Sequence, residues 1–96
     1  MVRKWKAGVL SLLLMAALAG CAVAPPVQEM AEARSAIDAA KQIHPAQPQA
    51  RQELKSAEQA LQEAASAIDR EQYELARRKA LEAKRKAQHA AQFHDQ

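Results

Sequence analysis

The sequence predicts an all-α protein, a small helical hairpin or three-helix bundle with alanine-rich seams, that follows a cleaved signal peptide. Composition is the first reason. After Cys21 the chain holds twenty alanines and no glycine, asparagine or threonine, and Glu, Gln, Lys, Arg and Leu dominate the remainder. All of these abundant residues are strong helix formers. Periodicity is the second reason, because apolar residues recur at spacings of three and four, which places them on one face of a helix.

Residues 1–20 are arranged as a secretory signal peptide. Arg3, Lys4 and Lys6 give a positive start, and residues 9–19 form an apolar run that is followed by Gly20. A charged start, a short apolar run and small residues before the cleavage site are the three parts of such a leader. The apolar run is shorter than the roughly 20 residues that a membrane-spanning helix needs, so a permanent span is the weaker hypothesis.

The end of this leader, Leu18-Ala19-Gly20-Cys21, resembles the lipobox of bacterial lipoproteins. The resemblance implies that a diacylglyceryl group is transferred to the Cys21 sulfur, because a thiolate is a good nucleophile. It also implies cleavage between Gly20 and Cys21 and acylation of the new amino group. The alternatives are ordinary secretory cleavage that leaves a free thiol, and an accidental match.

The position after the cysteine bears on the location of the protein. Two hydrophobic signals give stable membrane attachment where one acyl chain does not, so a lipidated Cys21 would anchor the chain to the membrane. Residue 22 is Ala. In enterobacterial lipoproteins an Asp there retains the protein in the inner membrane, so the resemblance implies an outer-membrane protein that faces the periplasm. Since this sorting rule varies between bacteria, the inner membrane stays open as an alternative.

Charge gives no support for nucleic-acid binding. The whole chain has a formal net charge of +3, but three of its positive charges lie in the leader. From Cys21 onward, eleven Lys and Arg face eleven Asp and Glu. The basic character of the sequence therefore belongs largely to the segment that is removed.

The remaining chain divides into a lipidated tether, residues 21–26, and an Ala-rich helical domain, residues 27–96. Helices are expected at about residues 27–43, 48–68 and 70–93. The segment His44-Pro45-Ala46-Gln47-Pro48 separates the first two, because prolines stop one helix and open another. The expected apolar stripes are Met30, Ala33, Ile37 and Ala40; then Ala50, Leu54, Ala57, Leu61, Ala64 and Ile68; then Tyr73, Ala76, Ala80, Ala83, Ala87 and Ala90.

The boundary between the second and third helices contains neither glycine nor proline. The stripe changes phase between Ile68 and Tyr73, which predicts a turn at about residues 69–71. Asp69 is suited to cap the following helix, with Gln72 reaching back in a variant of the capping box. The alternative is one continuous helix from about residue 47 to 93.

The pattern Tyr73-Glu74-Leu75-Ala76, preceded by Leu61, Ala64 and Ile68 and followed by further spaced alanines, resembles a family of short Ala-rich bacterial lipoproteins. Their domain is one of unknown function that also occurs ahead of OmpA-like peptidoglycan-binding domains. The family usually has a glycine before the aromatic residue, where this chain has Arg70-Glu71-Gln72. The pattern is also similar to half of a tetratricopeptide repeat, but there are too few repeats for a solenoid.

No catalytic or metal-binding constellation stands out. Ser35, Ser56 and Ser66 have no histidine at nearby helical spacing, and His89 and His94 are five residues apart, which does not place them on one face of a helix. We therefore expect neither an enzyme nor a cofactor, apart from the covalent lipid on Cys21.

One basic cluster could form an anion-binding ridge along one side of the last helix, opposite its alanines: Arg77, Arg78, Lys79, Lys84, Arg85 and Lys86. Such a ridge suits peptidoglycan or lipopolysaccharide; the plainer interpretation is a solvated face that complements the acidic second helix. A thin core in so small a domain also suggests self-association or an envelope protein partner. The leading hypothesis is a non-enzymatic outer-membrane lipoprotein that acts as an adaptor or assembly element, with no nucleic-acid partner.

Overall fold

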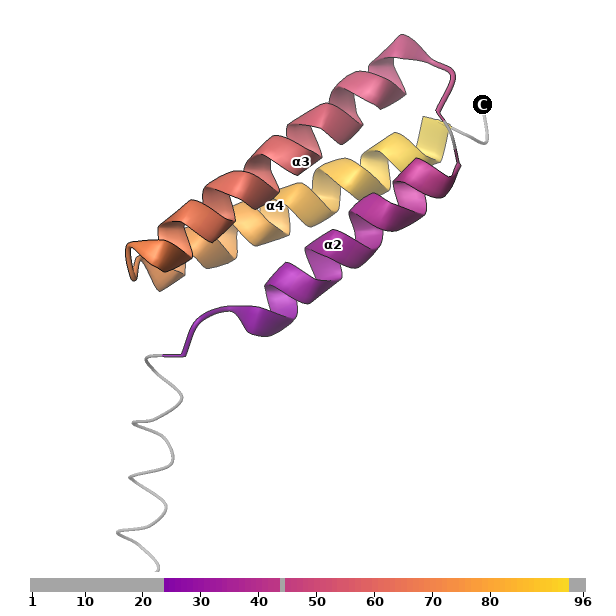
Figure 1. Ribbon diagram of the computed structural model, residues 1–96. Coiled ribbons are helices and arrows are strands. Elements are labelled where there is room, and N and C mark those ends of the chain that lie inside the picture. Colours follow the sequence, from indigo (N-terminus) through magenta and orange to yellow (C-terminus); the bar gives the residue numbers. More distant parts are fainter. Residues whose placement is uncertain (1–23, 44, 94–96) are drawn as a thin grey trace, which may run out of the picture.

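The computed structural model describes residues 24–43 and 45–93, and this part of the chain forms three α-helices. They are α2 (Val27–Gln42), α3 (Pro48–Asp69) and α4 (Tyr73–Gln92), and no strand occurs among the described residues. The helices lie side by side in a small bundle, with α4 behind α2 and α3 (Figure 1). The predicted all-α class and its three-helix form are therefore confirmed.

The bundle runs up, down and up. Its core is built in three layers, each with one buried residue from every helix: Met30, Ala64 and Ala80; Ala33, Ala60 and Ala83; Ile37, Ala57 and Ala87. Residue numbers rise through the layers in α2 and α4 and fall in α3, so α3 is antiparallel to both neighbours. The contact between α3 and α4 is the most extensive and that between α2 and α3 the least.

Alanine makes up most of the buried core. The core of the described chain consists of fourteen buried hydrophobic residues, of which twelve are alanine and two, Met30 and Ile37, are larger. Small side chains let helix axes approach to about 8 Å, the low end of the usual range. The larger side chains of α3 fill the space beside this seam, and half-buried Leu61 packs against all three layers.

The predicted stripes match two helices closely and the third in part. All four predicted residues of α2 are buried, and so are all the predicted alanines of α4. In α3, Ala60 and Ala67 are also buried, whereas Leu54, Leu61 and Ile68 are only half-buried. The buried face of α3 is thus centred on its alanines, and the larger side chains of the predicted stripe lie at the edge of that face.

The turn between α3 and α4 confirms the hairpin and excludes one continuous helix, but its mechanism differs from the prediction. Asp69 is the last residue of α3 and does not cap α4, which begins at Tyr73 rather than near residue 70. No side-chain hydrogen bond caps α4. The backbone closes the turn instead: Glu71 N–H donates to Ile68 at 2.9 Å, and Gln72 N–H donates to Ala67 at 2.8 Å.

The break between α2 and α3 is where the prolines place it. α2 ends at Gln42, and α3 opens with Pro48 in its first turn, a position where the missing N–H costs no hydrogen bond. At the same end of the bundle, Gln47 Nε2 donates a 3.2 Å hydrogen bond to the carbonyl of Phe93, which ties the start of α3 to the end of α4. Among the described residues no helix is both long and apolar enough to cross a membrane.

Candidate functional site

The residue predicted to carry the lipid, Cys21, and the predicted cleavage site between Gly20 and Cys21 lie outside the described residues. The structure does show which end of the bundle follows them along the chain. α2 begins at Val27 beside the α3–α4 turn, at the end of the bundle opposite the α2–α3 connection (Figure 1). Arg77, in the first turns of α4, lies 3.9 Å from Glu29 in the first turn of α2, which agrees with this placement.

The six basic residues of α4 do not form one ridge. Cations that are seven residues apart lie on the same side of the helix, so the six form three pairs that point in three directions around it. The first pair, Arg77 and Lys84, faces α2: Arg77 Nε lies 3.9 Å from Glu29, and Lys84 Nζ lies 3.2 Å from Glu32. These two cations therefore hold α4 to α2.

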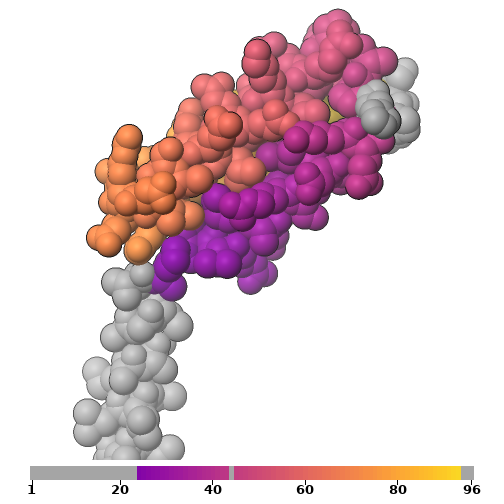
Figure 2. All heavy atoms as spheres, viewed as in Figure 1, coloured from indigo at the N-terminus to yellow at the C-terminus, as the bar shows by residue number. Residues whose placement is uncertain are grey.

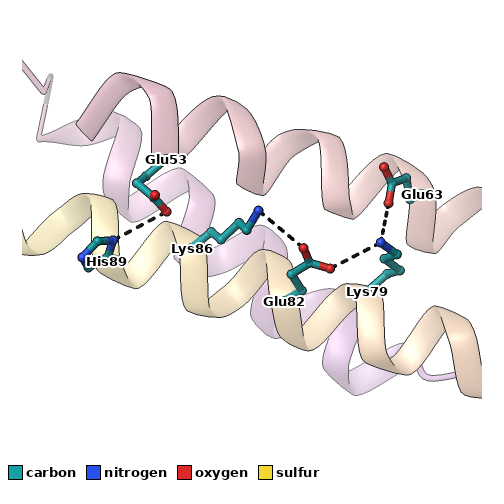
Figure 3. A network of polar contacts seen from close by, with 6 residues as sticks. All are labelled: Glu53, Glu63, Lys79, Glu82, Lys86 and His89. Atoms are coloured by element: carbon teal, nitrogen blue, oxygen red, sulfur yellow. Dashed lines mark ion pairs between the residues drawn. The ribbon is translucent and has the colours of Figure 1, made fainter. Parts of the chain in front are cut away.

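The second pair, Lys79 and Lys86, lies on the α3 side of α4 (Figure 3). Lys79 Nζ is 2.8 Å from Glu63 on α3 and 3.5 Å from Glu82, while Lys86 Nζ is 3.4 Å from Glu82. The hydrogen bond that Lys79 donates to the Glu63 carboxylate, aided by the negative charge of Glu82, raises the pKa of Lys79. Glu82 thus joins both lysines in one network that borders the α3–α4 contact.

The environment of Glu82 contains opposing effects. Partial burial acts to raise the pKa of its carboxyl group, but the positive charge of Lys79 and the hydrogen bonds from Lys86 and Lys79 outweigh that effect. The pKa of Glu82 consequently lies below its ordinary value of 4.5. Glu82 is therefore held in its charged form by the two lysines, which lie three residues before it and four residues after it.

Only the third pair, Arg78 and Arg85, lies opposite the alanine face. Arg78 is midway between Ala76 and Ala80, and at 100° per residue this places it roughly opposite the buried stripe. Arg85 stands in the same relation to the next two buried alanines. Both side chains are exposed, and within residues 24–43 and 45–93 no carboxylate lies within ion-pair distance of either.

The prediction of a six-residue ridge opposite the alanines is thus wrong in its geometry. A spacing of seven aligns each pair along the helix, but neighbouring residues differ by 100°. Four of the six cations consequently flank the core: Arg77, Lys79 and Lys84 meet carboxylates of adjacent helices, and Lys86 meets Glu82 of its own helix. Of the six cations, Arg78 and Arg85 lie on the outer face of α4, and between them lies Leu81, whose exposed fraction is 38%.

Several contacts were not found by sequence reasoning. Lys41 at the end of α2 lies 2.9 Å from Glu58 on α3, and this hydrogen bond, with the attraction of the carboxylate, raises the lysine pKa. His89 Nδ1 is 3.5 Å from Glu53, and its ring meets Phe93 edge-on with centroids 5.2 Å apart. The two ion pairs depend on the relative heights of α2, α3 and α4, which no spacing within one helix reveals, whereas His89 and Phe93 are four residues apart at the end of α4.

No metal-binding group of three or more His, Cys, Asp or Glu side chains occurs in the part of the chain that the structure describes. Two of the three serines considered above, Ser35 and Ser66, are exposed on their helices, and Ser56 is half-buried. Five of the seven ion pairs in the described chain join different helices, and four of these five join α4 to α2 or α3. These four pairs border the contacts that α4 makes with its two neighbours.

Comparison with known proteins gives one family. Residues 28–93 match the family model described as "Domain of unknown function (DUF4398)", a span that covers all three helices. No curated protein and no solved structure matches the chain. The match agrees with the resemblance to a domain of unknown function noted in the sequence. Because the matched span is well over half of the 96 residues, the chain belongs to the DUF4398 family.

Proposed function

We propose that this protein is an outer-membrane lipoprotein that faces the periplasm and acts without enzymatic activity as an adaptor or structural element of the envelope. The lipid on Cys21 fixes its location, and the helical bundle is the part that meets a partner. The observation that carries this proposal is Leu18-Ala19-Gly20-Cys21 at the end of a charged and apolar leader.

The structure limits which surfaces of the bundle are available for contact with a partner. The alanine faces pack against one another inside the bundle, so they are not free to dock on another protein. Among the described residues, Val27 and Leu81 are the large apolar side chains that stay exposed. Leu81 lies on the outer face of α4 between two arginines, and a leucine flanked by arginines suits a protein contact.

Processing at Cys21 tests the anchor. In the wild type we expect a membrane-bound protein that begins at Cys21 and has the added mass of one diacylglyceryl group and one acyl chain. Cys21→Ser should give an uncleaved and unlipidated precursor, as seen by intact-mass measurement of the membrane fraction. Correct processing of the mutant would contradict the proposal.

The outer-membrane assignment has a separate test at the next position. Ala22→Asp should move the lipidated protein from the outer-membrane to the inner-membrane fraction of a density gradient. Ala22→Ser, a change that adds no charge, is the matched control and should leave the protein in the outer-membrane fraction. Wild-type protein found in the inner-membrane fraction would contradict the assignment while leaving lipidation intact.

Site-specific photo-cross-linking tests the adaptor role. A photoreactive residue at Leu81 should give a discrete cross-linked product in whole cells, either with a second copy or with another envelope protein. The same residue at Ala65, which is exposed on α3, is the control and should not give that product. Equal products from both positions, or none from Leu81, would argue against contact through the outer face of α4.

A second candidate function is binding of peptidoglycan or lipopolysaccharide through cations of α4. The observation that favours it is that Arg78 and Arg85 are exposed and lack an ion-pair partner among the described residues. The test is co-sedimentation with each polymer of the wild type and of a variant with both arginines changed to Glu. Unchanged sedimentation would contradict this role. Arg77 and Lys84 are less suitable targets because each has a carboxylate partner on α2.

A further inference from the structure

The charges of the bundle are distributed unevenly along its axis. The layer of Ala33, Ala60 and Ala83 divides the described chain into a proximal half, residues 24–32 and 61–82, and a distal half, residues 34–43, 45–59 and 84–93. In the proximal half four Lys and Arg face seven Asp and Glu, a net charge of −3. In the distal half seven Lys and Arg face three Asp and Glu, a net charge of +4.

This polarity arises from the fold rather than from any one segment of the chain. The distal half collects the end of α2, the start of α3 and the end of α4, which lie together because α3 is antiparallel to the other two helices. Each helix contributes cations there: Arg34 and Lys41; Arg51 and Lys55; Lys84, Arg85 and Lys86. Asp95 lies outside the described residues, and adding its charge would leave the distal half at +3.

The predicted lipid attachment site, Cys21, precedes the proximal half of the bundle in the chain. Five residues lie between Cys21 and Val27, the first residue of α2, so the two Cα atoms are six steps apart and at most about 21 Å from each other. α2 begins in the proximal half, beside the α3–α4 turn (Figure 1). The 22 residues of α3 extend about 33 Å along the bundle. A lipid on Cys21 therefore holds the negative end near the membrane and leaves the positive end free to reach away from it.

The distal cations are accessible. Arg34, Arg51, Lys55 and Arg85 are exposed, and none has an ion-pair partner among the described residues. Figure 2 shows the face of the bundle formed by α2 and α3, two of the helices that contribute them. Within the described residues the large apolar side chains that are exposed, Val27 and Leu81, both belong to the proximal half. The distal surface is therefore charged without the apolar centre that a protein–protein contact normally has.

We propose that the distal half is an anion-binding end that holds a carboxylate-rich cell-wall polymer, peptidoglycan, while the lipid holds the proximal half at the membrane. The proposal rests on the proposed function for the position of the anchor. It differs from the ridge hypothesis because it assigns binding to one end of all three helices rather than to one side of α4. Long-range attraction between this end and the polymer weakens as salt screens the charges.

Two charge-altered variants of the full lipidated protein, purified in detergent, test the proposal. The distal variant carries Arg51→Glu and Lys55→Glu, and the matched proximal variant carries Arg70→Glu, Gln28→Glu and Gln62→Glu. All five residues are exposed and have no ion-pair partner in the described chain, and each variant lowers the total charge by four. The distal variant reduces the charge of its half from +4 to zero. The measurement is co-sedimentation with purified peptidoglycan sacculi, with and without amidation of their carboxyl groups.

We expect the wild type and the proximal variant to sediment alike, and the distal variant to bind roughly tenfold more weakly at low salt. Amidated sacculi should release all three proteins. Equal losses in the two variants would show that only total charge matters, and binding that survives amidation would show that carboxylates are not recognised. Either result, or no binding by the wild type, overturns the proposal. A mass spectrum of the same preparation reports acylation of Cys21, so failure of the anchor is recognised separately.

Discussion

The backbone N–H of Gln72 donates a 2.8 Å hydrogen bond to the carbonyl of Ala67, and the chain between them passes through Glu71 at a φ of 60°. With the 2.9 Å bond from Glu71 to Ile68, this is the hydrogen-bond pattern of a Schellman motif, in which the residue after the C-cap is left-handed. Glycine is the usual residue at that position. The turn that separates α3 from α4 therefore forms with a residue that is poorly suited to it.

Replacing this residue should stabilise the protein. A left-handed conformation costs a residue with a Cβ atom about 1–2 kcal/mol, and glycine avoids that cost but loses more entropy on folding. We expect Glu71→Gly to raise the free energy of unfolding by about 1 kcal/mol, or the melting temperature by roughly 5 °C. Urea and thermal denaturation followed by circular dichroism measure both quantities.

The matched control for this change is Glu71→Ala. It removes the same negative charge but keeps the Cβ atom, so it should bring no comparable gain in stability. If alanine stabilised the protein as much as glycine, charge repulsion near Asp69 and Glu74 would be the cause, and the backbone explanation would fail.

The close approach of the helices gives a second prediction. Ala80 and Ala83 are fully buried in the layers where α4 meets both neighbours. Leucine at either position should destabilise the bundle by about 1–3 kcal/mol, because extra methylene groups force the helices apart. Ala65→Leu, at an exposed position of α3, is the control and should change stability little. Similar melting temperatures for the buried and exposed substitutions would contradict a tightly packed seam.

Truncating a side chain gives a third prediction. Leu61 is the side chain that contacts all three core layers. Leu61→Ala removes this shared contact and should cost roughly 2 kcal/mol, the low end for such truncations because Leu61 is only half-buried. Leu81→Ala, which truncates an exposed leucine of α4, should cost much less. Equal losses, measured by urea denaturation, would show that Leu61 does not bridge the layers.

Acid should weaken the network around Glu82. Its pKa is lower in the folded protein than the ordinary 4.5, so the unfolded chain binds the extra proton more readily. The stabilisation is fully present above about pH 4.5 and is lost as the pH falls through the lower folded value. The difference in unfolding free energy between wild type and Glu82→Gln should therefore shrink in acid. Glu74→Gln, which removes an exposed carboxylate of the same helix, serves as the control. A difference that is constant between pH 7 and 3 would rule out the ion pairs as its source.

Much of the local structure could be predicted from spacing alone. Met30, Ala33, Ile37 and Ala40 fall on one face because a helix returns to the same side every three or four residues, and that face is buried. The burial of Ala60 and Ala67 was not predicted, because the expected stripe of α3 was centred on its larger apolar residues, whereas the structure turns the alanine side of α3 inward. The prediction that Asp69 caps α4 was also wrong. The side chain of Asp69 was suited to cap a helix, but backbone hydrogen bonds close the turn instead.

By itself, the sequence determined that the described chain is helical, that it breaks near residues 44–48 and 69–71, and which alanines of α2 and α4 are buried, since these features depend on neighbours within a few turns of one helix. Only the tertiary structure decided which charges meet. Arg77 and Lys84 pair with α2, and Lys79 with α3, because the antiparallel α3 and the parallel α2 present their carboxylates at those heights. The same arrangement gathers cations from three separate stretches at the distal half, since interactions through space depend on which helix ends lie together.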